Sequence, residues 1–214
     1  MHNTCWKSGA VLIGISCVVI IYGCASTKMT SRINPQCIDQ CLKRIMVSGN
    51  FADLEQQEIA ENKLFEKMQR YPQLVCVKSA DLFFPGKQYT QDDILRILNE
   101  NSIDAVLILQ PTNSGATSTY IPETKRTTGS VFVCGNTAYG SSTTRTTGGH
   151  SINKPWAHYE ESLLSCETGD VIWYATAKSG GNAFAKWDDL IRSAAGKTID
   201  RMVQDGVLGS VADE

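Results

Sequence analysis

Neither sign of charge dominates this sequence, which has 20 lysines and arginines against 22 acidic residues. It also lacks a basic stripe with interleaved aromatic residues and a compact cluster of lysine and arginine. Proteins that bind nucleic acid usually carry a basic patch, and proteins that bind anionic lipid by charge carry a basic cluster. The composition therefore argues against nucleic acid as a partner and against purely electrostatic binding to a membrane.

Motifs for catalysis are missing as well. The chain contains no Gly-x-Ser-x-Gly elbow for a nucleophilic serine. Gly196-Lys197-Thr198 does not indicate a phosphate-binding loop, because such a loop needs a glycine where Ile191 stands. The spacing of His150 and His158 matches no usual zinc site, and surface histidines are the simpler interpretation. We therefore predict that the protein is not an enzyme and uses no metal or cofactor.

A short apolar run near the N-terminus is the clearest positive feature. It covers residues 10–22, follows Lys7 and ends directly before a glycine and a cysteine. This arrangement is typical of an export signal, and the run is too short to span a bilayer comfortably. Ile21-Tyr22-Gly23-Cys24 resembles the lipobox of bacterial lipoproteins. The resemblance implies that residues 1–23 are removed and that Cys24 is acylated, for example with palmitate. An uncleaved N-terminal anchor is the alternative.

The residues that follow the acylated cysteine are small and polar. They predict a lipidated tether over residues 24–35, ended by Pro35, and a periplasmic domain over residues 36–209. Ala25, and not aspartate, stands directly after the cysteine, and the sorting rule of lipoproteins then implies the outer membrane. We expect a chain that is held by lipid on the periplasmic side of the outer membrane.

Five cysteines remain once the signal has been removed and Cys24 carries lipid. The periplasm is oxidising, so disulfides are able to form there. An odd number leaves at least one cysteine unpaired unless it bridges to another chain. The candidates for a disulfide or a free thiol are Cys37, Cys41, Cys76, Cys134 and Cys166. Their connectivity stays open.

The hydrophobic pattern predicts a single α/β (α+β) domain, with a mixed β-sheet packed by about three helices. The expected order is strand, helix, strand, helix, strand, hairpin, helix. Helices are predicted at 52–70, 90–101 and 187–204, and strands at 44–47, 74–77, 105–109, 159–166 and 171–175. The last helix is amphipathic. We expect it to pack on the sheet through Trp187, Ile191, Ala194 and Met202.

Residues 112–151 differ in composition from the rest of the chain. More than half of them are Ser, Thr or Gly, and few are aliphatic. Such a segment cannot bury enough apolar surface to form a folded unit of its own. Composition allows a disordered loop or a long exposed hairpin. We predict a projecting arm that engages a partner, because exposed strand edges accept strands from other chains.

Two motifs indicate a family of folds. Residues 102–107 (SIDAVL) are similar to a "G-[IV]-D-A-V-L" entry into a central strand, and residues 162–173 are similar to an "S-L-x-D-x-x-T-G-x-x-x-W" hairpin. Both recur in outer-membrane lipoproteins with a small α/β domain, such as the curli-secretion lipoproteins and the lipoprotein activators of peptidoglycan synthases, and in the N-terminal domain of the translocation protein TolB. The resemblance implies this fold and a role in the cell envelope.

Three functions follow as hypotheses, in order of preference. The first is a binding, assembly or regulatory lipoprotein with an envelope protein as partner, as a monomer or an oligomer. The second is a subunit of an oligomeric secretion channel of the curli type, in which a hairpin from each subunit would cross the membrane. Such a hairpin needs apolar residues at every second position over about ten residues per strand, and residues 112–151 offer only Val131, Phe132, Val133 and Tyr139. An envelope enzyme is the third and is not expected.

Overall fold

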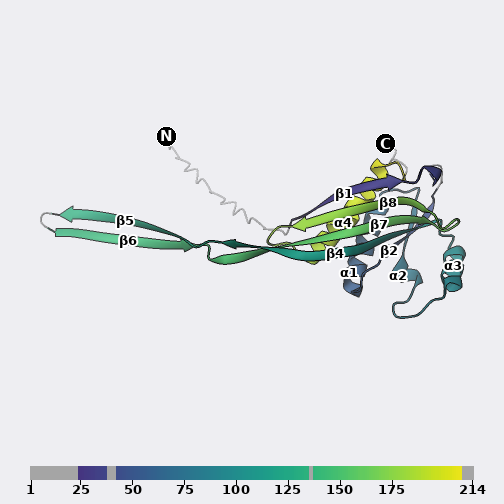
Figure 1. The fold of residues 1–214 in the computed structure, drawn as a ribbon, viewed down its shortest axis with the longest axis horizontal. Coiled ribbons are helices and arrows are strands. Elements are labelled where there is room, and N and C mark those ends of the chain that lie inside the picture. Colours follow the sequence, from purple (N-terminus) through teal and green to yellow (C-terminus); the bar gives the residue numbers. More distant parts are fainter. Residues whose placement is uncertain (1–23, 38–41, 135–136, 209–214) are drawn as a thin grey trace, which may run out of the picture.

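The computed structural model describes residues 24–37, 42–134 and 137–208. It contains a six-stranded sheet in the order β1-β8-β7-β4-β2-β3 and a separate two-stranded ribbon of β5 and β6 (Figure 1). The strands are β1 (Ala25–Ile33), β2 (Arg44–Gly49), β3 (Val75–Lys78), β4 (Ala105–Ile121), β5 (Thr124–Cys134), β6 (Thr137–Thr147), β7 (His150–Ser165) and β8 (Val171–Gly181). The predicted fold class, a single α/β domain with a mixed sheet and a long Ser/Thr/Gly-rich hairpin or loop, is confirmed, and the described part of this segment is a hairpin.

The connections between parallel strands place helices on both faces of the sheet. β2 pairs in parallel with β3 on one side and with β4 on the other. α1 (Leu54–Met68) connects β2 to β3, whereas α2 (Ser79–Leu82) and α3 (Gln91–Glu100) lead back from β3 to β4. Right-handed crossovers that move in opposite directions along a sheet place their helices on opposite faces. α4 (Trp187–Gln204) packs against α1, β1 and β8. α1 and α4 therefore share one face, and α3 lies on the other.

Local sequence signals account for the ends of the helices. The Asp53 side chain accepts a hydrogen bond from the backbone N–H of Gln56 at 3.1 Å, where α1 begins. Thr90 and Asp93 form a capping box at the start of α3, since the Asp93 N–H donates to the Thr90 hydroxyl at 3.1 Å and the Thr90 N–H donates to the Asp93 carboxylate at 3.3 Å. These contacts satisfy backbone groups that helix ends otherwise leave unpaired.

The main hydrophobic core lies between the sheet and the α1–α4 layer. Ala105, Leu107 and Leu109 of β4 are fully buried there, whereas Val106 and Ile108 between them face the other side of the sheet. Other large side chains without exposed surface in this core are Ile45, Leu64, Met68, Leu163, Trp173, Leu190, Ile199 and Met202. This alternation along β4 is what the apolar run at 105–109 predicts for a strand covered on both faces.

The residues expected to be a tether outside the domain instead form its edge strand β1. They pair with β8 in antiparallel register along the whole length of the strand. The polar composition conceals an alternation, in which Ala25, Met29 and Ile33 pack against the core while the residues between them point outward or carry hydroxyl groups. Cys24 is thus followed at once by the sheet. No flexible spacer separates the proposed lipid attachment from the folded body.

The residues predicted to face the core from the last helix are buried in the structure, except for the first of them. Ile191, Ala194 and Met202 are buried, as expected. Trp187 stands at the first position of α4 and is 40% exposed, so its predicted place in the core is wrong. Leu190 is fully buried and takes that place. A residue three positions later lies on the same side of a helix and one turn deeper into the packed region.

Truncation of Ile191 tests the docking of α4. We expect Ile191→Ala to lower the free energy of unfolding by about 2–5 kcal/mol, because it leaves a cavity in a closely packed core. Trp187→Ala is the matched change at the exposed start of the same helix and should cost clearly less. Urea unfolding of both variants beside the native protein measures the difference. An equal loss in the two variants would show that α4 docks by another face.

Candidate functional site

The structure projects a long two-stranded arm from one end of the sheet. We call residues 115–156 the arm. It begins where β8 ends, because Gly180 is the last residue of β8 to pair with β7, opposite Trp156. The arm then contains the outer part of the β4–β7 ladder and the whole β5–β6 ribbon (Figure 1). Each strand of the β5–β6 ribbon has 11 residues, which corresponds to a length of about 36 Å at about 3.3 Å per residue.

The base of the arm is fixed by a tryptophan that lies over a glycine. Gly115 pairs with Trp156, and a Cβ atom at position 115 would come within 2.7 Å of the indole ring. The ring of His158, two residues further along β7 toward the body, contacts the indole, with 5.2 Å between the ring centroids. Only glycine leaves room for the indole at this place. The direction in which the arm leaves the sheet is therefore set by side-chain packing as well as by the ladder.

A short interruption separates the two ladders of the arm. Pro122 and Glu123 face Gly148 and Gly149, whose φ angles are +91° and +73°. A side chain at position 148 would collide with the carbonyl oxygen of Pro122. The backbone N–H of Gly149 donates to the carbonyl of Ile121 at 2.8 Å. Glycine is the residue that adopts positive φ without strain, so these two glycines allow the ribbon to change its twist and continue as β5 and β6.

The β5–β6 ribbon, which we call the distal ribbon, has no third strand. In the described part of the chain these two strands pair only with each other. Rows of hydroxyl side chains cross the ribbon, and the hydroxyl oxygens lie 2.9 Å apart in Thr127–Thr144 and 3.1 Å apart in Ser130–Ser141. A two-stranded ribbon without a core is at best marginally stable in water. Its two outer edges carry free N–H and C=O groups that are able to pair with further strands.

The predicted lipidation residue lies at the same end of the sheet as the arm. Cys24 is exposed, and its carbonyl oxygen accepts a hydrogen bond from the backbone N–H of Asn182 at 3.0 Å. The next residue, Ala25, pairs with Gly181 at the end of β8, beside the base of the arm. Figure 1 shows β1 beginning at the end of the sheet from which the arm leaves. A lipid on Cys24 would thus bring the base of the arm to the membrane.

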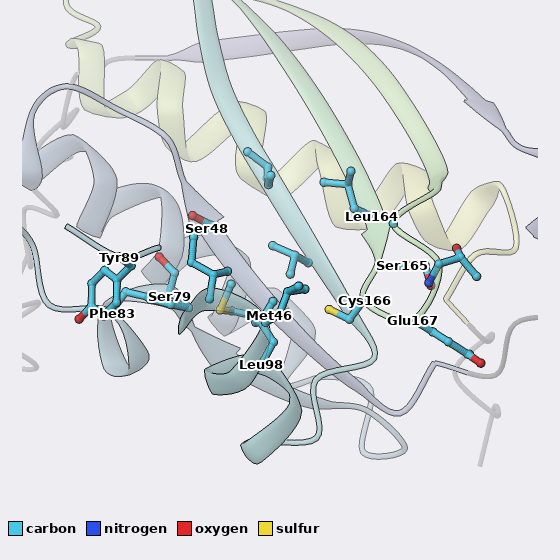
Figure 2. A pocket seen from close by; sticks show the side chains of 16 residues that line it. Met46, Ser48, Ser79, Phe83, Tyr89, Leu98, Leu164, Ser165, Cys166 and Glu167 are labelled. Atoms are coloured by element: carbon cyan, nitrogen blue, oxygen red, sulfur yellow. The ribbon is translucent and has the colours of Figure 1, made fainter. Parts of the chain in front are cut away.

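The face of the sheet opposite the main core carries an apolar groove. It has a volume of about 670 Å³ and lies at the end of the sheet away from the arm. Figure 2 shows the side chains that line it, which come from β2, β4, β7, α2, α3 and the loops beside them. Ile94 and Leu95 of α3 border the groove and are about 40% exposed. The polar side chains that line it are Ser48, Ser79, Tyr89, Ser165, Cys166, Glu167 and Thr168.

The cysteines show no disulfide among those whose side chains the structure describes. Cys24, Cys37, Cys76 and Cys166 are all free thiols. Cys37 is buried in the core. Burial raises the pKa of the Cys76 thiol to about 12, and burial together with the charge of Asp104 raises the pKa of Cys166. Thiols of this kind react slowly.

Two of the cysteine predictions cannot be compared with the structure. Cys41 lies outside the described residues. Cys134 ends β5, and the description of the ribbon there covers the backbone only. Pairing of these two cysteines, with each other or with another chain, stays a prediction.

Two glutamates are buried, and the first is fully hydrogen-bonded. Glu61 of α1 accepts hydrogen bonds from the side chain of Gln57 at 2.9 Å and the hydroxyl of Ser79 at 2.6 Å. The backbone N–H groups of Gly49 and Ala80 also donate to it, each at 3.2 Å. This carboxylate ties the end of β2 to α1 and α2. Its role is structural, because its oxygens are occupied by the protein itself.

The second buried glutamate lacks such partners. Glu161 of β7 is 1% exposed and lies between Leu109 and Ala175 of the neighbouring strands, under α4. Neither of its carboxylate oxygens has a hydrogen-bond partner among the described atoms. Burial raises the pKa of Glu161 to about 8. The Thr198 hydroxyl opposes this rise, but its proton is directed to the carbonyl oxygen of Ala194 at 2.9 Å. Glu161 is therefore protonated in the folded protein at neutral pH.

Glu161 should make stability depend on pH. The folded state holds the proton up to a pKa of about 8, whereas the unfolded state loses it near 4.5. Stability from this group is complete below pH 4.5 and falls as the pH rises to 8, by up to about 1.4 kcal/mol per pH unit. Glu161→Gln removes the titration. We expect the variant to gain stability over the native protein steadily from pH 5 to pH 8 in urea unfolding. Parallel pH profiles for the two proteins would contradict a protonated Glu161.

Residues considered for a metal site do not come together. Within residues 24–37, 42–134 and 137–208, no three His, Cys, Asp or Glu side chains gather closely enough to hold a metal ion. His150 lies in the arm and His158 at its base. Among the same residues, no helix has the length and apolar character needed to cross a membrane.

Comparisons with known proteins give a distant likeness of fold. No protein-family model matches the sequence, and no curated protein matches it. Among solved structures, the chain is similar to the PelC dodecamer from Paraburkholderia phytofirmans, with 12% identity over 81% of this chain and 94% of that chain and a TM-score of 0.48. A variant PelC dodecamer from the same organism gives 12% identity over 81% and 95%, with a TM-score of 0.46. Lipoprotein GNA1162 from Neisseria meningitidis gives 11% identity over 77% and 98%, with a TM-score of 0.40.

Proposed function

We propose that this chain is a lipid-anchored assembly protein of the bacterial cell envelope, and that its arm joins other chains by strand pairing. One observation carries the proposal: a ribbon whose two outer edges pair with no other strand in the described part of the chain extends from a well-packed body. The body supplies the stability that the ribbon lacks. None of the described side chains of the ribbon belongs to the hydrophobic core, so we infer that its length serves pairing with another chain.

Strand addition would satisfy the backbone of the distal ribbon. Along each outer edge of β5 and β6, every second residue directs its N–H and C=O away from the partner strand. Water satisfies these groups in a monomer, but a two-stranded ribbon gains too little from its own ladder to be firmly ordered. A further strand on each edge adds a new ladder and packs the hydroxyl rows side by side. A second copy of the arm is the simplest source, since each copy offers both kinds of edge.

The anchor supports the same proposal. Because β1 starts directly after Cys24, acylation there would hold the end of the sheet against the membrane with almost no slack. All copies would then present their arms at the same height. This arrangement raises the local concentration of the arms and favours pairing between them. The sorting rule for lipoproteins favours the outer membrane, on its periplasmic side.

A subunit of an oligomeric secretion channel is the second candidate. Two features of the arm favour it: the distal ribbon alone, at about 36 Å, is longer than the hydrocarbon layer of about 30 Å, and it leaves the body at the end where Cys24 lies. The side chains count against it. Lys125 and Thr127 lie on one face of the ribbon and Arg126 and Thr128 on the other, so neither face offers a continuous apolar surface to lipid.

Replacement of Cys24 tests the anchor. Cys24→Ser removes the thiol that accepts the lipid, and we expect the variant to move from the membrane fraction to the soluble periplasmic fraction. Mass spectrometry of the native protein should show an acylated N-terminal peptide that begins at Cys24. A mature native chain that still contains Trp6 and Lys7 would contradict lipidation and would point to an uncleaved anchor.

Proline substitutions test pairing at the edges of the arm. Consecutive residues of a strand direct their N–H groups to opposite sides. Of Thr127→Pro and Thr128→Pro, one therefore removes an outward N–H and the other breaks the β5–β6 ladder. We expect the outward variant to keep the ribbon, as seen by amide exchange, and to shift the lipidated protein in detergent to smaller oligomers in sedimentation.

Valine at the same two positions is the matched control, because it keeps both N–H groups. Thr127→Val and Thr128→Val should leave the oligomer unchanged. An oligomer that survives both proline substitutions would show that the edges of the ribbon do not hold the copies together, and a native protein that sediments as a monomer would contradict the proposal outright.

A further inference from the structure

Two arginines stand directly opposite each other on the distal ribbon. Arg126 of β5 pairs with Arg145 of β6, and both are exposed. Side chains of directly opposed residues lie on the same face of a sheet, about 5 Å apart at their Cβ atoms. Hydroxyl residues continue this face in both directions along the ribbon. The arginines and hydroxyls line a shallow hollow of about 540 Å³, formed by Arg126, Thr128, Gly129, Ser130, Ser141, Thr143 and Arg145. We call this surface the arginine face.

The two guanidinium groups are not neutralised within the described chain. Neither Arg126 nor Arg145 has an ion pair there, whereas Arg96 and Arg201 each contact a carboxylate on their own helix or at its end. Lys125, next to Arg126 but on the opposite face, contacts Glu123 at 3.1 Å. Like charges directly opposite each other destabilise a two-stranded ribbon. An anion bound between them would turn this cost into a favourable interaction.

The charge of the arm differs in sign from that of the body. Four of the 20 basic residues and one of the 22 acidic residues lie in the arm, which gives it a net charge of +3. Lys7 belongs to the signal segment, so the rest of the mature chain has 15 basic and 21 acidic residues and a net charge of −6. A basic surface on an otherwise acidic protein attracts anionic partners selectively.

We propose that the arginine face binds an extended acidic polysaccharide. The face is two strands wide, about 10 Å, since neighbouring strands lie about 4.8 Å apart. The rows from Arg126 to Ser130 cover about 13 Å of its length. This area is far below the roughly 800 Å² per partner of a stable protein interface, but it fits a single chain of sugars.

The chemistry of the two kinds of side chain matches such a ligand. Opposed guanidinium groups are able to hold one carboxylate by charge-assisted hydrogen bonds. Ser130 and Ser141 hydrogen-bond to each other at 3.1 Å, and each hydroxyl keeps further acceptor capacity for sugar hydroxyl groups. This surface consists of side chains on one face, whereas strand pairing uses the backbone at the edges. Binding and assembly are therefore separable.

Binding of defined polymers to the full-length lipidated protein in detergent tests the proposal. The probe is polygalacturonate, with neutral dextran as the uncharged comparison. We expect the native protein to bind polygalacturonate at least tenfold more tightly than dextran, and the binding to weaken with added salt. The double change Arg126→Gln and Arg145→Gln should reduce the affinity at least tenfold. Arg145→Glu should abolish binding while it stabilises the ribbon, because it replaces a repulsive pair by an attractive one.

Lys125→Gln is the matched control, since it removes one positive charge at the neighbouring position on the opposite face. It should change the affinity less than twofold. An equal loss in Lys125→Gln and in the arginine variants would overturn the proposal in favour of unspecific attraction. So would equal binding of dextran, binding of phosphatidylglycerol vesicles in place of polygalacturonate, or no binding at all. The oligomer distribution of the arginine variants should match that of the native protein, which separates this test from that of assembly.

Discussion

The antiparallel ladder between β4 and β7 is the interaction on which the rest of the structure depends. It runs from Ala105 opposite Ser165, in the centre of the sheet, to Ile121 opposite His150, in the arm. Its inner half is buried between α1, α4 and α3, and its outer half is exposed on both sides. The well-packed half thus holds an end of the ladder that has too little apolar surface to order itself. Packing in the core determines the register between β4 and β7, and the continuous ladder extends this register into the arm.

Two contacts that require glycine determine the direction in which the arm leaves the sheet. Trp156 can lie over position 115 only because that residue is glycine, and the ribbon can continue past Pro122 only because Gly148 and Gly149 adopt positive φ. Both sites lie outside the hydrophobic core and add little to its stability. Their effect is on direction and twist, which would matter if the arm pairs with the arm of another chain, as proposed above.

One core position of the body is occupied by an ionisable residue without a hydrogen-bond partner for its carboxyl oxygens among the described atoms. Glu161 occupies a core position between Leu109 and Ala175, where an aliphatic side chain would fit the pattern of the strand. Removal of a carboxyl group from water without a partner costs stability, and the group meets that cost by keeping its proton. Glu61, by contrast, is buried with four donors around it. Stability of the body should therefore be greatest on the acidic side of neutrality.

The sequence predicted the central strands and the helices of the body, but it missed the edge strand β1 and the exposed position of Trp187 at the start of α4. The helix predicted at 90–101 and the strand that begins at Ala105 are confirmed, because a helix cap and a long apolar run determine local structure largely independently of their surroundings. β1 was not predicted because its inward residues are too small and too few to stand out among polar neighbours; pairing with β8 decides its conformation. Trp187 was placed in the core by periodicity alone, although helix ends are exposed.

The arginine face could not be read from the sequence for a related reason. Strands rich in threonine have no strong difference between their two faces, so the register that brings Arg126 opposite Arg145 is not visible in the pattern. The excess of positive charge in residues 115–156 was the one signal that could have drawn attention to it.

Amide hydrogen exchange in the distal ribbon, measured for the lipidated protein in membrane vesicles and for dilute protein in detergent, tests the central claim most directly. In separate copies, alternate amides of β5 and β6 should be only weakly protected, because the ribbon alone is marginally stable, and those between them should exchange rapidly. If the arms pair in the membrane, both sets should become protected, while protection of the body stays the same. Alternate amides that remain unprotected in the membrane would contradict strand pairing as the purpose of the arm.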